Sequence, residues 1–146
     1  MKAESDMKPK KYVIENKLNN ECDIIFNTNI AEIEVETEIG IEKQYQYDTY
    51  RMKTKYRDNL EQVLEEKTEY DKWLKIAQET EYNELAKVIR NKRDKLLNDT
   101  DWTQMKDTSL SEDKVLKYQR YRQALRDIPE QEGFPYDVKF PKLEEM

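Results

Sequence analysis

The stretch Ala31-Glu32-Ile33-Glu34-Val35-Glu36-Thr37-Glu38-Ile39-Gly40-Ile41 alternates apolar or small residues with glutamates. Because successive side chains of a β-strand point to opposite faces, this period of two predicts a strand with one apolar face and one acidic face. Tyr45 and Tyr47 keep the same parity, so the strand either continues to about residue 47 or bends or bulges at Gly40. Glutamates on one strand face repel one another, so we expect that face to lie in water, with docking to a basic partner as the alternative.

Two short apolar runs precede this strand. They are Tyr12-Val13-Ile14 and Ile24-Ile25-Phe26, and Asn16, Asn19 and Asn20 lie between them. Apolar runs on either side of turn-favouring residues are typical of a hairpin. Together with the alternating stretch, they predict a small antiparallel β-sheet over residues 1–47.

The segment from about Asp48 to Asn98 contains neither Gly nor Pro and consists mostly of strong helix formers. It therefore predicts one long helix or two. A stripe of residues spaced alternately four and three apart runs along its first half, and consists of Tyr56, Leu60, Val63, Lys67, Tyr70, Leu74 and Ala77. Such a stripe is either a coiled-coil seam, through which the chain would form a homo-oligomer, or the packing face of a helical hairpin.

The helical phase shifts near residues 79–83, which predicts a kink or a short turn there. A new stripe follows, made of Tyr82, Leu85, Ala86, Ile89, Arg93, Leu96 and Leu97. Turn-favouring residues end this helix, and Ser109 with Glu112 forms the pattern of a capping box for the next one. That helix should end at about Ile128, because Pro129 cannot continue it.

The tail from Gly133 to Pro141 cannot be helical and should run extended, with Phe134, Val138 and Phe140 as anchors. The expected fold class is therefore α+β, with an N-terminal small antiparallel β-sheet, a long central helix or helices, and a C-terminal helical hairpin with an extended tail. We expect three parts: a β-rich region at 1–47, a long helix or coiled-coil connector at 48–80, and the hairpin with its tail at 81–146. Charged residues make up 40% of the chain, which favours an elongated molecule with solvated helices.

Composition argues against several classes of function. Histidine is absent, and acidic residues are so frequent that no carboxylate pair stands out, so we expect no enzyme. The formal charge of −6 argues against nucleic-acid binding, because acidic residues lie among the basic ones of the C-terminal helices. A nucleic-acid-binding regulator, the weaker alternative, would use those basic residues.

We expect neither a metal nor another cofactor. An EF-hand pattern that begins at Asp99 fails at Gln104 and Leu110, and two glycines cannot build a phosphate-binding loop. No apolar run is long enough to span a membrane, and the start of the chain lacks a secretory signal. We therefore expect a protein of the cytoplasm without a membrane partner.

The connection within Arg90 to Gln104 carries one large aromatic side chain, Trp102. An indole needs an apolar bed and an acceptor for its N–H, so we expect Trp102 to fold back over Leu96, Leu97 and the next helix and to close a helical hairpin.

Two arginines, Arg93 and Arg126, lie on or near the apolar stripes, where a guanidinium is costly unless a carboxylate meets it. Asp94, Asp101 or Asp127 can supply that carboxylate. The arrangement is either an ion-paired hairpin or a polar groove that grips the chain end of a partner.

Several separated blocks of this region occur in a characteristic order. They are Arg93-Asp94, Leu96-Leu97, Thr100-Asp101-Trp102-Thr103, Tyr121-Arg122-Gln123-Ala124-Leu125-Arg126-Asp127-Ile128-Pro129 and Gly133-Phe134-Pro135. Over roughly residues 85–141 this set resembles the C-terminal signature of the phage tail assembly chaperone family. The chain departs from it at Met105-Lys106, where the family commonly has Leu-Pro, and at Phe140, where the family has Trp.

The resemblance implies a protein that binds a tail-fibre or baseplate component in the bacterial host cytoplasm and promotes its folding, oligomerisation or attachment without catalysis. The alternative is a structural component of the baseplate or fibre base that stays in the virion or phage-tail-like particle. The candidate partner-binding residues are Arg93, Asp94, Thr100, Asp101, Trp102, Thr103, Tyr121, Arg122, Arg126, Asp127, Pro129, Phe134 and Pro135.

Overall fold

The computed structural model describes residues 1–15 and 19–145, and it combines an antiparallel sheet with helices, as expected for an α+β fold. Within it the chain divides into two compact units, residues 1–81 and 82–146, each of which is described by itself. Asn16, which the sequence suggested for the first turn, lies outside the described residues.

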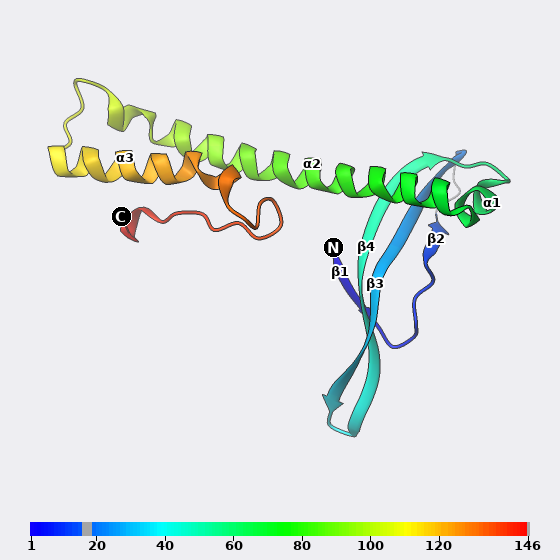
Figure 1. Ribbon diagram of the computed structural model, residues 1–146. Coiled ribbons are helices and arrows are strands. Elements are labelled where there is room, and N and C mark those ends of the chain that lie inside the picture. Colours follow the sequence, from blue (N-terminus) through cyan, green and yellow to red (C-terminus); the bar gives the residue numbers. More distant parts are fainter. Residues whose placement is uncertain (16–18, 146) are drawn as a thin grey trace. The chain divides into compact units, whose positions relative to one another are not determined.

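The first unit contains a four-stranded antiparallel sheet in the order β1-β4-β3-β2 (Figure 1). Its strands are β1 (Lys2–Ser5), β2 (Tyr12–Glu15), β3 (Glu21–Thr37) and β4 (Gly40–Lys55). The predicted pairing of the two short apolar runs is confirmed, because Tyr12 lies opposite Phe26 and Ile14 lies opposite Ile24.

The alternating glutamate stretch is not one strand that continues or bends at Gly40. The chain reverses at Glu38 and Ile39, so that Thr37 pairs with Gly40 and the following residues run back along β3. The sequence concealed this turn because the alternation continues through it, while the odd-numbered residues change faces. Ile41 therefore lies opposite Glu36, on the glutamate face, and the apolar face expected to include it is shorter than predicted.

The helical region begins later than expected. Residues 48–55 still belong to β4, which pairs with β3 as far as Glu21 and Lys55, so strand pairing overrides their helix propensity. Helix α1 (Leu60–Glu65) and helix α2 (Lys67–Asp99) follow, separated at Glu66, which is extended. Of the kink or short turn predicted near residues 79–83, the turn is wrong, because α2 runs through that segment without interruption.

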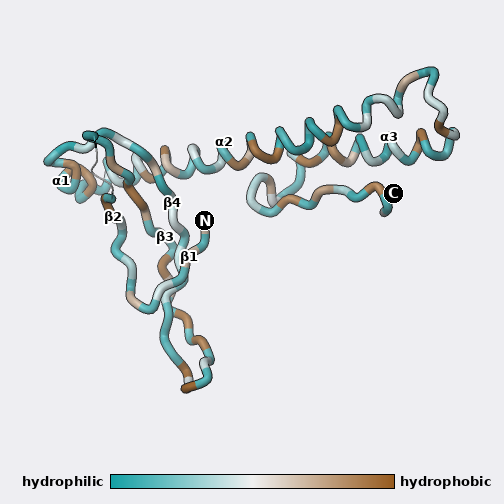
Figure 2. Tube along the Cα trace, turned by 180° about the vertical axis from the view of Figure 1, so that it is seen from behind, coloured by the Kyte–Doolittle hydropathy of each residue, from teal (hydrophilic) through white to brown (hydrophobic). Residues whose placement is uncertain are grey.

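The first core lies between the sheet and the start of the helical region. Cys22, Ile24 and Phe26 alternate along β3 and are almost fully buried. They form one cluster with Leu60, Tyr70 and Ala77 of the helical stripe and with Leu64, which lies beside it, and hydrophobic residues recur along β3 and α2 (Figure 2). The stripe is thus a packing face of this unit, although the surface it meets is a sheet instead of a second helix.

The second unit comprises the end of α2, the short 3-10 helix η1 (Asp101–Gln104), helix α3 (Glu112–Arg126), and two further 3-10 turns, η2 (Ile128–Glu130) and η3 (Leu143–Glu145). The predicted capping box does not form, because α3 begins at Glu112 with Ser111 as its N-cap and without a side-chain cap bond. Helix α3 also ends two residues before Ile128, which starts η2 together with Pro129.

The tail anchors are confirmed, because Phe134, Val138 and Phe140 pack against the core residues Tyr121 and Leu125. The tail is only partly extended, since the segment 131–137 forms turns. Its tightest point requires a glycine: a Cβ on residue 133 would lie 2.3 Å from the carbonyl oxygen of Asp137.

Candidate functional site

A buried guanidinium joins the end of α2 to α3. The side chain of Arg122, in the second half of α3, is only 9% exposed. Its Nη1 donates to the carbonyl oxygen of Leu97 at 2.5 Å and to Thr100 Oγ1 at 2.8 Å, and its Nη2 donates to Asp101 Oδ1 at 2.6 Å. We call these four residues, Leu97, Thr100, Asp101 and Arg122, the Arg122 lock.

The position of this guanidinium has a physical cause. The last carbonyl groups of a helix lack intrahelical donors and carry partial negative charge, so a cation beside them is favourable. Thr100 Oγ1 shares its proton between the carbonyl oxygens of Leu96 and Leu97, at 2.9 Å and 3.1 Å. Asp101 supplies the carboxylate that a buried guanidinium needs. The lock therefore satisfies the end of α2 and fixes it to α3.

The same contacts shape the turn that carries Trp102. Thr103 is fully buried, and its hydroxyl donates to the carbonyl oxygen of Thr100 at 2.7 Å. Thr100, Asp101 and Thr103 thus have their side chains bound within the turn, whereas Trp102 remains 48% exposed. Its ring lies 6.1 Å from that of Tyr118 on α3.

The expectation that Trp102 folds back over Leu96, Leu97 and the next helix is met for the next helix, because its ring contacts Tyr118 on α3. It is not met for a closed apolar bed, because Trp102 is 48% exposed. The lock occupies the last turn of α2, and the indole leans on Tyr118 with about half of its surface in solvent.

The other predicted ion pairs are only partly formed. Arg93 pairs with Asp94, with 2.7 Å between Nη2 and Oδ1, as expected. Arg126 is exposed, and Asp127 accepts a hydrogen bond from Gln123 instead. The guanidinium that α3 buries is that of Arg122. A sequence signal for it existed, because Tyr118, Arg122 and Leu125 are spaced four and three apart and so lie on one helical stripe.

The remaining candidates belong to the core of the second unit. Tyr121 is buried against Leu125 and Ile128, and this burial, followed by the charge of Asp99, raises the pKa of its hydroxyl. The ring of Phe134 packs on the same core, with the guanidinium carbon of Arg90 5.3 Å from its centroid. Two prolines complete the set, since Pro135 is buried and Pro129 is half-buried in η2.

Exposed apolar residues lie on the connection between α2 and α3 and on the first turns of α3. Of these, only Trp102 was among the site residues predicted from the sequence. Met105 is 59% exposed and Leu116 is 50% exposed. Leu116 also lines a hollow of about 310 Å³, together with Leu110, Glu112 and Val115. We call Trp102, Met105, Leu110 and Leu116 the turn surface. The adjacent pair Val115 and Leu116 was a sequence signal for an exposed apolar side chain, because a helix cannot turn two consecutive side chains towards the same partner.

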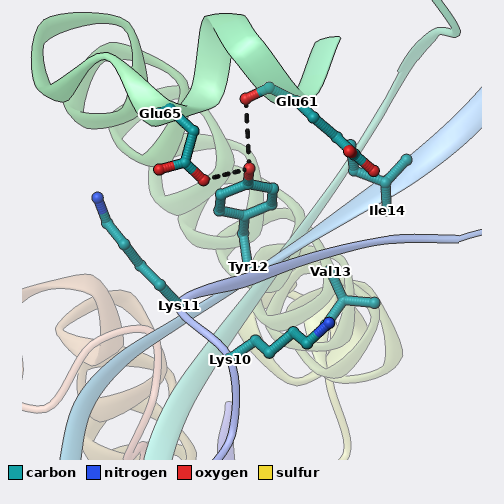
Figure 3. A pocket seen from close by; sticks show the side chains of 7 residues that line it. All are labelled: Lys10, Lys11, Tyr12, Val13, Ile14, Glu61 and Glu65. Carbon is teal, nitrogen blue, oxygen red and sulfur yellow. Dashed lines mark hydrogen bonds between the residues drawn. The ribbon is translucent and has the colours of Figure 1, made fainter. Parts of the chain in front are cut away.

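The first unit has a hollow of its own, of about 540 Å³, between β2 and α1 (Figure 3). The hydroxyl of Tyr12 points to Glu65 Oε1 at 2.9 Å and to the carbonyl oxygen of Glu61 at 3.3 Å. Burial, and next the hydrogen bond to Glu65, raises the pKa of Tyr12 to about 12. The ammonium of Lys11 lies 3.6 Å from the centroid of the Tyr70 ring. These contacts tie the edge strand β2 to α1 and α2.

The order of the locked turn, the exposed Trp and the anchored tail corresponds to a known family. Residues 86–143 match the family model described as phage tail assembly chaperone protein. Most of the second unit is therefore similar to phage tail assembly chaperone proteins. The match contains the whole Arg122 lock and the turn surface, and it confirms the resemblance stated from the sequence. No curated protein and no solved structure matches the chain.

The similarity to phage tail assembly chaperone proteins supports a role in tail assembly and suggests that this role is not enzymatic. It also suggests that the partner is a phage protein. Among the described residues, no helix combines the length and the apolar character needed to cross a bilayer.

Proposed function

We propose that the second unit binds a folding tail-fibre or baseplate subunit through the turn surface, and that this binding promotes folding, oligomerisation or attachment of the subunit in the bacterial host cytoplasm. The observation that carries the proposal is Trp102, a large aromatic residue held half-exposed on a turn whose other side chains are bound.

A rigid, exposed aromatic residue is well suited to binding. Trp and Tyr contribute much of the energy at protein interfaces, because they offer a large apolar area and lose few rotamers on binding. The Arg122 lock fixes the backbone around Trp102, so little conformational entropy remains to be lost there. The hollow beside Leu110 and Leu116 offers room for an apolar side chain of the client.

In this proposal the predicted site residues have two different roles. Thr100, Asp101, Thr103 and Arg122 position the turn, and Trp102 contacts the client. The proposed interface is therefore apolar, which differs from the polar groove considered from the sequence alone. Its binding should depend weakly on salt, because apolar contact does not depend on screened charges.

The test is binding of the purified chain to each fibre and baseplate protein of the particle, produced separately. Trp102→Ser and Leu116→Ser should each weaken binding of the client by about 10-fold or more, since a buried apolar side chain contributes over 1.4 kcal/mol. Val88→Ser is the matched control, because Val88 is 64% exposed in the same unit but lies on α2 away from the connection. Unchanged affinity of the Trp102 and Leu116 variants would refute the turn surface as the interface.

A second candidate is a structural subunit of the baseplate or fibre base that stays in the finished particle. The specific observation that favours it is the β-rich first unit, which lies outside residues 86–143 and adds a folded part that a chaperone domain alone would not need. Mass spectrometry of purified particles separates the two: stoichiometric presence would identify a resident subunit, and absence would identify a transient chaperone.

A further inference from the structure

Beyond the end of β1, the two long strands of the first unit continue as a two-stranded ribbon. Strand β1 pairs with β4 only as far as Tyr45, and β2 pairs with β3 only from Asp23 to Phe26. From the Ile33–Gln44 pair to the turn, β3 and β4 are therefore bonded only to each other (Figure 1). We call residues 33–44 the arm. No residue of the arm is buried, so it has no core of its own.

The end of the arm is apolar. Ile39, in the two-residue turn, is 89% exposed, and Ile41 is 72% exposed. The hydropathy colouring shows this hydrophobic tip at the end of the ribbon (Figure 2). Two-residue hairpin turns favour Asn, Asp and Gly, so an isoleucine there is a poor local choice. Since no packing within the chain compensates for it, the position points to a function outside the folded unit.

The charge around this tip is strongly negative. Glu36, Glu38 and Glu42 flank the two isoleucines, and Glu34 lies further along the same ribbon. The one basic residue of the arm, Lys43, is paired with Glu32 at 2.6 Å. The hydrogen bond from Lys43 lowers the pKa of Glu32, so that this carboxylate stays ionised as well. The tip therefore presents two apolar side chains with glutamates on both faces of the ribbon, and Lys43 is the only basic residue of the arm.

This charge argues against a second copy of the chain as the partner. Two arms that met edge to edge would place their glutamates side by side, which is destabilising. It favours a surface with an apolar pocket and lysine or arginine residues around the rim, because complementary potentials steer association and fix orientation.

We infer that the arm is a second docking element, whose tip of Ile39 and Ile41 inserts into an apolar pocket with a basic rim on a tail protein. This goes beyond the proposed function, because the arm lies outside the chaperone-family match and its contact differs in chemistry from the turn surface. Binding through the arm weakens with salt, whereas binding through the turn surface does not.

The experiment measures binding of the full chain to each tail protein of the particle, produced separately and immobilised. The double variant Ile39→Ser with Ile41→Ser should weaken binding to one tail protein by about 10-fold or more, since it removes two buried apolar side chains. The double variant Glu36→Lys with Glu38→Lys should weaken binding to the same protein. Raising the salt from about 0.05 M to about 0.5 M should weaken binding of the unmodified chain, because it screens the charges at the rim.

The matched control is Met7→Ser, because Met7 is 80% exposed in the same unit and lies off the arm. Melting curves of the arm variants should equal that of the unmodified chain, since the substituted side chains are exposed. The inference is overturned if no tail protein loses affinity with the isoleucine variant, or if the lost affinity responds neither to charge reversal nor to salt. A dimer of the chain that dissociates in the isoleucine variant would also overturn it. Trp102→Ser in the same assay reports on the turn surface alone, so failure of the arm is distinguishable from failure of the proposed function.

Discussion

Different kinds of interaction stabilise the interior of each unit. The first buries Ile24, Phe26 and Leu64 completely in one apolar cluster. The second has a smaller apolar cluster and depends at its turn on the buried guanidinium of Arg122. Their charges differ as well: residues 1–81 contain 13 basic and 19 acidic residues, whereas residues 82–146 contain 13 of each. The whole net charge of −6 therefore belongs to the first unit, which has the larger apolar core.

This difference indicates that the two units should fail under different substitutions. In the first, removing apolar volume should be the most damaging change. In the second, removing the buried donor should also be damaging, because the guanidinium of Arg122 makes three hydrogen bonds to the end of α2 and the turn.

The largest effect is expected from Phe26→Ala. Phe26 is fully buried and packs edge-on against Tyr70, with 5.4 Å between ring centroids. Its truncation should destabilise the first unit by about 3 to 5 kcal/mol, through lost burial and the cavity that remains. The measurement is denaturant unfolding followed by the fluorescence of Trp73, in a chain that also carries Trp102→Phe so that only the first unit is observed.

The matched control for this prediction is Ile39→Ala, which removes an apolar side chain from the exposed tip of the arm and should change stability by less than about 0.5 kcal/mol. If both substitutions cost the same, apolar burial is not what distinguishes the first unit.

The second largest effect is expected from Arg122→Met, which keeps much of the side-chain volume and removes every donor. The carbonyl oxygen of Leu97 and the side chain of Asp101 then lose the charged donor. Thr100 still donates to the carbonyl oxygen and water can reach Asp101, which is 58% exposed, so we expect a cost of about 2 kcal/mol. Hydrogen exchange should accelerate in the last turns of α2 and in α3. The same substitution at Arg126, which is exposed on the same helix, should have almost no effect. Equal protection in the two variants would contradict a structural role for the lock.

The parts of the fold that could be predicted from the sequence are those that depend on neighbouring residues in the chain. Period-two alternation identified strands, and the spacing of Leu60, Tyr70 and Ala77 identified a packing face. The turn at Glu38 and Ile39 could not be found, because it lacks turn-favouring residues before Gly40 and leaves the alternation unbroken. The start of the helical region was placed too early, because the pairing of residues 48–55 with β3 is a non-local interaction that propensity does not contain.

The residues of the candidate site were named from the sequence, but the sequence did not show which of them would be buried and which exposed. The block Thr100–Thr103 and Arg122 was identified through the family resemblance. The sequence did not reveal that Arg122 would be buried in place of Arg126, because that depends on the rotation of α3 against α2. It also did not reveal that Trp102 points outwards, since the lock that occupies the last turn of α2 joins residues more than twenty positions apart.

A smaller effect is expected from Trp102→Ala. A fully buried Trp would cost about 3 to 5 kcal/mol on truncation. Trp102 is half-exposed and contacts the ring of Tyr118, so we expect about 1 kcal/mol, the usual size of an aromatic pair. Thermal unfolding of the variant checks this value. A loss as large as that of Arg122→Met would mean that Trp102 stabilises the second unit and is not free to bind a client.

The smallest effect is expected from Tyr12→Phe, which tests the polar contact between β2 and α1 in the first unit. At pH 8 the substitution removes the hydrogen bond to Glu65, which should cost about 1 kcal/mol or less. The pKa of Tyr12 is about 12 in the folded chain and 10 for an ordinary tyrosine. Between these values the unfolded chain has lost the proton and the folded chain still holds it, so unfolding releases a proton and stability falls as pH rises.

The Tyr12→Phe variant has no hydroxyl to titrate at this position. The unmodified chain should therefore lose stability faster than the variant between pH 10 and about 12. Denaturant unfolding across that range, followed by Trp73, measures the two slopes. Glu65→Gln should retain part of the slope, because burial is the larger cause of the raised pKa and the carboxylate is the second. Parallel loss of stability in the unmodified chain and in Tyr12→Phe would show that the contact between β2 and α1 is too exposed to shift the titration.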